Sequence, residues 1–299
     1  MALQRFTFRA MAAENELQVH CDDVDLGRRG AQAAMAEVGR IEAKYSRYRP
    51  DTVVSRINAQ AGGRPVPIDD ETRSLLRYAE ALYRQSVGLF DPTSGVLRRA
   101  WRFDQPEVPC NAILAAMVKQ IGWDRVEISD RGVRLRDPGM ELDFGGFGKE
   151  YAVDRAGLVL REHGIASAMV NLAGDLAILG PQPDGSPWRV GIRHPRRDNA
   201  VIATLPVSSG AIATSGDYER FIEVDGVRHC HVLDPRTGRS ARGFQSVTVH
   251  AESCLVAGSA STVAMLKGRE EGLAWLAELG LAHLAVLDDG AVVDASHPA

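Results

Sequence analysis

The stretch Leu142–Asp154 reads LDFGGFGKEYAVD, and the expected fold of the middle of the chain depends on it. The apolar run Glu141–Phe144 predicts a short strand, and the spacing of later apolar residues predicts a helix over Lys149–His163. The loop between them is rich in glycine, so its backbone N–H groups can approach a ligand closely, and a helix start favours an anion. The alternative is a tight strand-to-helix turn without a ligand, and this stretch alone does not decide between the two.

Turn signals elsewhere in the sequence predict that most strands form hairpins. The clearest hairpin is Phe221–Leu233, in which Asp225 and Gly226 supply the residues that a two-residue type I′ turn requires. Ser46–Asn58 is expected to be irregular because Pro50 interrupts it. Apolar residues at helical spacing predict helices over Gly30–Tyr45, Asp70–Ser86, Leu255–Lys267 and Glu270–Leu279. Hairpins with helices grouped between them predict an α+β fold of antiparallel sheets with packed helices, not a doubly wound parallel fold.

Length and composition set the broad class of protein. At 299 residues, the chain has room for a single domain or for two intimately packed halves. The formal net charge of −4 argues against general nucleic-acid binding, and no apolar stretch is long enough to span a membrane. The cysteines are isolated, so we expect free thiols in a reducing compartment. The N-terminal residues lack the pattern of a secretory signal, and we expect a cytoplasmic protein.

Several polar, glycine-containing stretches stand apart from the periodic elements. They are Phe90–Gly95, Asp143–Glu150, Ala213–Glu219 and His231–Gly238, and a helix rich in hydroxyl residues begins within Ser253–Thr262. Each has an ordinary structural alternative, such as an Asp-Pro turn or a helix hydroxyl that bonds back to a carbonyl. Together they supply carboxylates, a lysine, a histidine, hydroxyls and bare backbone. Such a set can hold a pyrophosphate and a metal and can remove a proton from a nucleophile.

The order of these stretches resembles that of the FAD:protein FMN transferase family, also called the ApbE family of flavin transferases. The matching residues cover nearly the whole chain and are Met11, Ser46–Asn58, Gly88–Trp101, Asp143–Asp154, Asn171–Asp175, Thr214–Glu219, His231–Gly238 and Ala257–Ala264. The resemblance implies a T-fold-related α+β architecture. It also implies an enzyme that uses FAD and Mg²⁺ to move FMN onto a Thr hydroxyl of a target flavoprotein, with release of AMP.

The resemblance also implies roles for individual residues. The expected FAD contacts are Met11, Tyr48, Phe90, Asp91, Pro92, Asp143, Lys149, Thr214, Glu219 and Val232. His231 is the expected catalytic residue, either as general base or as the group that orients the Thr, and a neutral imidazole suits both roles. The expected metal contacts are the Gly146 carbonyl and the hydroxyls of Ser261 and Thr262.

The sequence departs from the family pattern at two positions. The family has an Asp that binds Mg²⁺ where this chain has Gly258, and it usually has A-K-G where this chain has Gly148–Glu150. Because Mg²⁺ is usually held by one or two carboxylates plus substrate phosphates, the loss of that Asp is expected to weaken the metal site. Glu150, Asp175 and Asp217 are candidate replacements.

These departures leave alternative functions open. One is an FAD-binding protein without transferase activity, and another is an FAD pyrophosphatase in which water replaces the Thr hydroxyl. For each, the expected partner is FAD, with no nucleic acid and no insertion into a membrane. The transferase would also need an acceptor flavoprotein that carries the Thr. The chain is expected to be a monomer or a homodimer.

Overall fold

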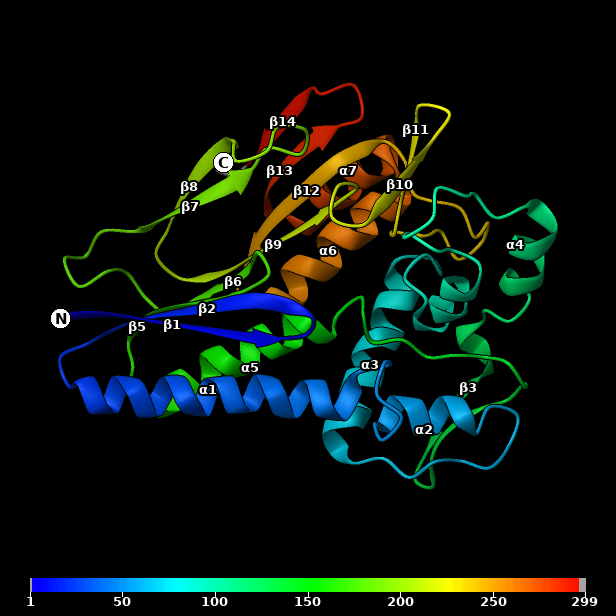
Figure 1. Cartoon of the computed structure of the whole chain (residues 1–299), viewed down its shortest axis with the longest axis horizontal. Coiled ribbons are helices and arrows are strands. Elements are labelled where there is room, and N and C mark those ends of the chain that lie inside the picture. The colour runs from blue at the N-terminus through cyan, green and yellow to red at the C-terminus, as the bar shows by residue number, and fades with distance from the viewer. Residues whose placement is uncertain (1, 296–299) are drawn as a thin grey trace.

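The main sheet is antiparallel throughout, and three of its seven neighbouring strand pairs are hairpins (Figure 1). A computed structural model describes residues 2–295 of the chain. Side by side, the eight strands are β1 (Ala2–Ala10), β2 (Ala13–Cys21), β5 (Ser167–Leu172), β6 (Asp175–Ile178), β9 (Gly210–Gly216), β12 (Phe244–Ala251), β13 (Ala282–Leu287) and β14 (Val292–Ala295). The separate hairpins are β3–β4 (Val126–Ser129, Gly132–Leu135), β7–β8 (Trp188–Arg193, Val201–Val207) and β10–β11 (Phe221–Val224, Val227–Cys230).

The turns of three hairpins explain their tight register. Asp225 and Gly226 have φ angles of 51° and 72°, as the sequence predicts for a type I′ turn. Ala173 and Gly174 make the same kind of turn between β5 and β6, with φ angles of 51° and 95°. Met11 also adopts a positive φ of 54°, because it lies in the two-residue turn that joins β1 to β2. Met11 therefore lies at the tip of a hairpin.

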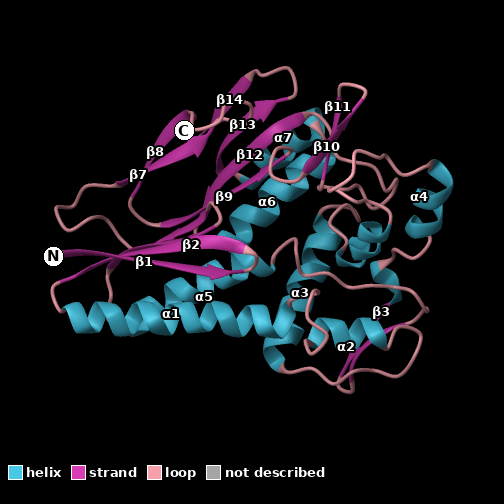
Figure 2. Ribbon diagram, in the orientation of Figure 1, coloured by secondary structure: helices cyan, strands magenta, loops and turns pink. Residues whose placement is uncertain are grey.

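Helices cover one face of the sheet, and the β7–β8 hairpin covers the other (Figure 2). The α-helices are α1 (Val24–Tyr45), α2 (Val53–Ala59), α3 (Asp70–Gln85), α4 (Asn111–Val118), α5 (Gly148–Glu162), α6 (Cys254–Lys267) and α7 (Arg269–Leu279), and the 3₁₀ helices are η1 (Pro92–Arg99) and η2 (Trp123–Arg125). The helices α1, α5 and α6 pack directly on the strands, and α7 packs on α6. The helices α2, α3 and α4 gather beside one end of this layered body. The α+β class predicted from the sequence is confirmed.

A large apolar core fills the space between the sheet and its helices. Phe144 and Phe147, on either side of the glycine-rich turn, are among its most buried side chains. Their rings lie 4.8 Å apart between centroids, and Phe144 also stacks on Tyr45 of α1. These aromatic contacts fix both ends of the glycine-rich loop, so the loop rests on a rigid base.

Two local predictions were wrong. Glu141–Phe144 forms no strand, because the side chain of Asn58 provides the hydrogen bonds that a neighbouring strand would otherwise make. The Asn58 amide donates to the Leu142 carbonyl at 2.8 Å and accepts from the Leu142 N–H at 2.7 Å. The end of the segment expected to be irregular is helix α2, whose first turn is capped by the hydroxyl of Thr52.

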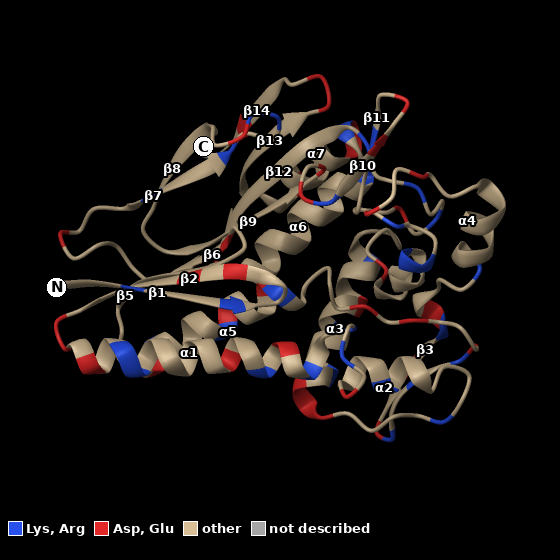
Figure 3. Ribbon diagram, in the orientation of Figure 1, with Lys and Arg blue, Asp and Glu red and all other residues tan. Residues whose placement is uncertain are grey.

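Charged residues of both signs are interspersed along the surface helices (Figure 3). One cluster joins three helices: Glu71 of α3 binds Arg40 and Lys44 of α1 and accepts a hydrogen bond from Tyr151 of α5. This cluster ties the region around α3 to the layered body.

Candidate functional site

The first turn of α5 places Lys149 beside a buried carboxylate. Lys149 Nζ lies 2.6 Å from Asp175 Oδ2, and Asp175 is the first residue of β6. The other oxygen of Asp175 accepts the backbone N–H of Thr214 at 3.3 Å. Burial alone would lower the pKa of Lys149, but the charges of Asp175 and Glu150 outweigh it and raise that pKa. Lys149 is therefore a fixed cation at the end of the glycine-rich loop.

Glu150 follows Lys149 and points into the interface between α5 and α6. Only 8% of the residue is exposed, and its Oε2 atom has no hydrogen-bond partner. Burial raises the pKa of Glu150, and the nearby Asp175 carboxylate raises it further. The side chain lies against Gly258 of α6, where an added Cβ would lie 2.5 Å from Glu150 Cγ. Glu150 thus fills the space that a side chain at position 258 would need.

Hydroxyl groups from β9 and α6 meet one helical turn beyond Gly258, the residue against which Glu150 lies. Ser215 Oγ lies 2.8 Å from Ser261 Oγ and 2.9 Å from Thr262 Oγ1. Successive residues of a strand face opposite sides of a sheet, so Thr214 points away from α6. Its hydroxyl instead lies 2.9 Å from Thr248 Oγ1 on β12. The expected metal contacts Ser261 and Thr262 are brought together, whereas the side chain of Thr214 lies on the other face.

Asp143 and Tyr48 are linked through Arg47. Arg47 forms an ion pair with Asp143 and donates a 2.8 Å hydrogen bond to the Tyr48 hydroxyl. Asp143 also accepts the N–H of Gly145 at 2.9 Å, so its carboxylate shapes the glycine-rich loop. Burial tends to raise the pKa of Tyr48, but Arg47 and Arg220 lower it overall. The Tyr48 side chain is otherwise exposed, as an aromatic group that stacks on a ligand would be.

His231 follows β11 and lies within the electrostatic field of the same cations. Its Nδ1 atom lies 3.3 Å from the carbonyl oxygen of Arg220. Desolvation lowers the pKa of His231, and the charges of Arg220, Lys149 and Arg47 lower it further. The imidazole is therefore neutral near pH 7 and able to accept a proton. Its neighbour Val232 is buried in the main core and anchors this segment.

The Phe90–Asp91–Pro92 turn packs against the glycine-rich loop. Both oxygens of Asp91 are engaged by the turn and its surroundings: one accepts the N–H and the hydroxyl of Thr93, and the other accepts the N–H of Trp123. The Pro92 carbonyl accepts the Asp143 N–H at 2.9 Å. A Cβ on Gly146 would lie 3.2 Å from the Phe90 ring. These contacts position the loop and favour the structural alternative for Asp91.

Other predicted residues lie apart from this group. Glu219 is exposed and lies 3.6 Å from Arg193 at the end of β7, and Met11 is at its hairpin tip. Asp217, a candidate replacement ligand, is held by two hydrogen bonds from Arg196, at 2.7 and 2.6 Å. Arg47 and Ser215 were missed by sequence reasoning, although both lie inside stretches that the motifs identify.

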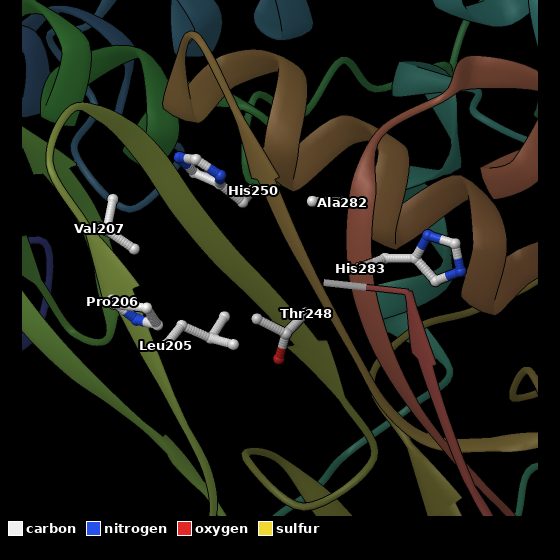
Figure 4. Close-up of a pocket in the computed structure, with 7 residues that line it drawn as sticks. All are labelled: Leu205, Pro206, Val207, Thr248, His250, Ala282 and His283. Carbon is white, nitrogen blue, oxygen red and sulfur yellow. The ribbon is translucent and has the colours of Figure 1, made fainter. Parts of the chain in front are cut away.

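Among the hollows formed by residues 2–295, two lie outside this group of residues. The smaller, of about 30 Å³, lies between β8 and the strands β12 and β13 (Figure 4), and a volume of that size suits a single water. Its lining residues are Leu205, Pro206, Val207, Thr248, His250, Ala282 and His283. The larger, of about 530 Å³, lies between α4 and residues 236–239, beyond the segment that carries His231. None of the predicted site residues lines either hollow.

Within residues 2–295, no group of three or more His, Cys, Asp or Glu side chains is placed to hold a metal ion. A cation near Glu150 would therefore depend on hydroxyl, carbonyl and ligand oxygens as well. The buried, unpartnered Glu150 oxygen and the hydroxyls of Ser261 and Thr262, one turn along α6 from Gly258, are hard oxygen donors of the kind that fit Mg²⁺. In the same part of the chain, no helix is both long and apolar enough to cross a membrane.

Comparison with known proteins points to one family. The sequence profile described as the ApbE family matches residues 11–285. A protein named FAD:protein FMN transferase from Rhodobacter capsulatus is 32% identical over 272 residues, which are 88% of this chain and 52% of that protein. The chain thus spans about half the length of that relative. A protein of the same name from Vibrio cholerae is 32% identical over 240 residues, covering 78% of this chain and 72% of that protein.

A solved structure agrees with the sequence comparison. The crystal structure of the ApbE protein from Thermotoga maritima has a TM-score of 0.90 with this chain and 33% sequence identity. The superposition covers 98% of this chain and 97% of the Thermotoga maritima chain. The similarity therefore extends over the sheet, its helices and the neighbouring region around α3.

Proposed function

Because the chain belongs to the ApbE family, we propose that it transfers the FMN part of FAD to a Thr hydroxyl of a target flavoprotein. The names of the related proteins support this activity. The observation that carries it in this chain is the meeting of a glycine-rich helix start, the Lys149–Asp175 ion pair and a neutral His231 within one electrostatic field. The helix start and Lys149 can stabilise the negative charge of a pyrophosphate, and a neutral His231 can take the proton of a hydroxyl nucleophile.

The proposed reaction exchanges the phosphoanhydride bond of FAD for a phosphoester bond to the Thr. The Thr hydroxyl oxygen attacks the phosphorus of the FMN half, the bond from that phosphorus to the bridging oxygen breaks, and AMP leaves with that oxygen. The Thr proton passes to the neutral imidazole of His231. Lys149 and the N–H groups at the start of α5 stabilise the negative charge of the pyrophosphate. Asp175 keeps Lys149 charged and in place, and it acts as a positioning residue.

The oxygen atoms of Glu150, Ser261 and Thr262 fit a divalent cation. When bound, Mg²⁺ supplies further neutralisation of the phosphate oxygens. The residues that would hold it are Glu150, Ser261 and Thr262, together with the Gly146 carbonyl that the family resemblance indicates. Of the FAD contacts, we propose Asp143 and Tyr48 beside Arg47 as the polar edge of the flavin or adenine pocket.

The location and the assembly of the protein are further proposals. Cys21, Cys110, Cys230 and Cys254 are all free thiols, which supports a reducing compartment such as the cytoplasm. The acceptor is proposed to present a Thr in an accessible segment, since the nucleophile has to reach the edge where His231 is exposed. A monomer or a homodimer is proposed for the free protein.

The activity is tested by mass spectrometry of Thr-bearing acceptor proteins after incubation with the enzyme, FAD and MgCl₂. The expected result is an FMN adduct on Thr and an equal amount of AMP, with no adduct when FMN replaces FAD. Release of FMN and AMP without an acceptor would instead identify a pyrophosphatase. Retention of intact FAD with every acceptor would identify a flavin-binding protein without transferase activity.

The role of His231 is tested with His231→Asn. General acid–base catalysis is worth roughly 10²–10⁴-fold, so the transfer rate should fall by an amount in that range while the FAD affinity changes little. The rate of the unmodified enzyme should also fall on acidification, as the imidazole becomes protonated. An unchanged rate in the variant would exclude His231 as the base.

A further inference from the structure

We propose that Glu150 of α5 is the carboxylate ligand of a divalent cation, in the space that Gly258 leaves free on α6. This inference rests on the proposed function, because the cation is expected to bind together with the pyrophosphate of FAD. It assigns a ligand role to a residue of this chain at which the sequence departs from the family pattern. It also explains why this chain can lack an acidic side chain at position 258.

The first argument is the state of the Glu150 carboxylate. A buried carboxylate is normally paired with a cation or held by hydrogen bonds, because it loses its hydration. Glu150 is 8% exposed, and its Oε2 atom has no hydrogen-bond partner. Lys149, whose charge acts on Glu150, is committed to Asp175 at 2.6 Å. Two carboxylates therefore share one ammonium group, which leaves the charge of an ionised Glu150 incompletely compensated.

The second argument is the shape of the α5–α6 interface. A Cβ at position 258 would lie 2.5 Å from Glu150 Cγ and 3.0 Å from Glu150 Oε1. The Glu150 carboxylate thus occupies the volume that a side chain on α6 would fill. Positions four residues apart lie on the same face of a helix, so Gly258 and Thr262 are neighbours on α6. Glu150 therefore points to the face of α6 that also carries Thr262.

The third argument comes from the protons of the hydroxyl cluster. Each hydroxyl donates one hydrogen bond and can accept others. Ser261 donates to the Gly258 carbonyl at 3.0 Å, so Ser215 has to donate to Ser261. Thr262 then has to donate to Ser215, which leaves only lone pairs on Thr262 for any further partner. An oxygen that offers only lone pairs suits a cation and does not suit a further acceptor.

These observations indicate the class of cation and its mode of binding. Carboxylate and hydroxyl oxygens are hard ligands, which favours Mg²⁺ or Mn²⁺ over a soft metal. Because the described residues contain no group of three strong ligand side chains, the protein alone supplies too few ligands. Phosphate oxygens have to complete the shell, so binding of the cation should require FAD. Without FAD, the affinity should be weak.

The test measures Mn²⁺ binding by the full chain with saturating FAD and no acceptor, using the electron paramagnetic resonance signal of free Mn²⁺. Four proteins are compared: the unmodified chain, Glu150→Gln, the exchange variant E150G/G258D and the control Glu162→Gln. Glu162 is exposed at the end of the same helix, so its loss controls for the general charge of α5. FAD affinity is measured separately without metal, and melting temperature is recorded with and without MgCl₂.

We expect Glu150→Gln to weaken Mn²⁺ binding by about tenfold or more, as loss of a hard anionic ligand should. FAD affinity without metal should stay within about threefold in that variant, and its melting temperature should no longer rise with MgCl₂ when FAD is present. E150G/G258D returns a carboxylate to the same space from α6, so it should bind Mn²⁺ within about threefold of the unmodified chain. Glu162→Gln should change neither quantity.

Unchanged Mn²⁺ affinity in Glu150→Gln would overturn the proposal, and so would the absence of Mn²⁺ binding by the unmodified chain with FAD. Failure of E150G/G258D to bind Mn²⁺ would contradict the claim that the two positions share one space. The proposed transferase function fails separately, if FAD itself does not bind or if no acceptor is modified.

Discussion

Replacing Lys149 with Met should destabilise the protein strongly even when no ligand is present. The substitution keeps most of the aliphatic stem and removes the ammonium group that lies 2.6 Å from Asp175. The Asp175 side chain is 4% exposed, so its charge would remain buried without a partner, beside the buried Glu150. Breaking a buried ion pair from one side costs roughly 3–5 kcal/mol. Since the Lys149 side chain keeps 32% exposure, we expect the lower end, about 3 kcal/mol.

The measurement is urea unfolding, monitored by circular dichroism in the absence of FAD and metal. A loss of about 3 kcal/mol corresponds to a fall in melting temperature of roughly 5 °C for a protein of this size. The double variant K149M/D175N removes both charges, so it should recover to within about 1 kcal/mol of the unmodified protein. If Lys149→Met loses less than about 1 kcal/mol, or if the two substitutions act additively, the ion pair does not hold this interface.

The pH dependence of the same variant gives an independent check. Without Lys149, the buried carboxyl group of Glu150 loses the cation that lowers its pKa, so its folded pKa should lie further above its unfolded value. A carboxyl group of that kind costs stability above its folded pKa, and the cost disappears as the pH falls and the group takes up a proton. The deficit of Lys149→Met should therefore be smaller at about pH 5 than at about pH 8. A deficit that grows on acidification would contradict this account.

Other residues give simpler tests by urea unfolding. Asn58→Ala leaves the N–H and C=O groups of Leu142 without partners, so it should cost about 2–3 kcal/mol, and an unchanged midpoint would show that water replaces the amide. Asp154 of α5 has the carboxylate that accepts the first N–H groups of α6, so Asp154→Ala should cost about 1–2 kcal/mol. The control is Glu162→Ala, at the exposed end of α5. The hydrogen bond from Arg40 is the largest of several contacts that lower the pKa of Glu71 below its ordinary 4.5. A carboxyl group whose pKa is lower in the folded state adds stability that is complete above its unfolded pKa and is lost as the pH falls. Glu71→Gln should therefore flatten the decline in stability below about pH 4.5. An equally steep decline in the variant would refute the role of Glu71.

The sequence predicted the fold class and the family, because both depend on patterns that are local or ordered along the chain. The hairpin at Asp225 and Gly226 and the helix α3 were predicted closely, since turn chemistry and apolar spacing act over a few residues. The strand expected at Glu141–Phe144 failed because its backbone partner is an amide side chain 84 residues earlier in the sequence. No local pattern reports such a contact.

The candidate site was predicted in part for the same reason. Motifs identified Lys149 and the hydroxyls of α6, but not that Asp175 would hold Lys149 or that Ser215 would join those hydroxyls. Those contacts depend on how β6 and β9 are placed beside the helices. The opposite orientation of Thr214 follows from strand alternation, and the register of β9 was needed to recognise it. The roles of His231 and of the FAD contacts stay predictions.

The link between Asp154 and the start of α6 also has a consequence for the order of folding. The two oxygens of Asp154 accept the N–H groups of Cys254 and Leu255, across 100 and 101 residues of sequence. Contacts between residues so distant in sequence form slowly, because a long loop has to close before they are made. The first turn of α6 should therefore become protected from hydrogen exchange only after α5 has packed on the sheet. The chain would acquire its hydroxyl cluster, and with it the place for a cation, among its last folding events.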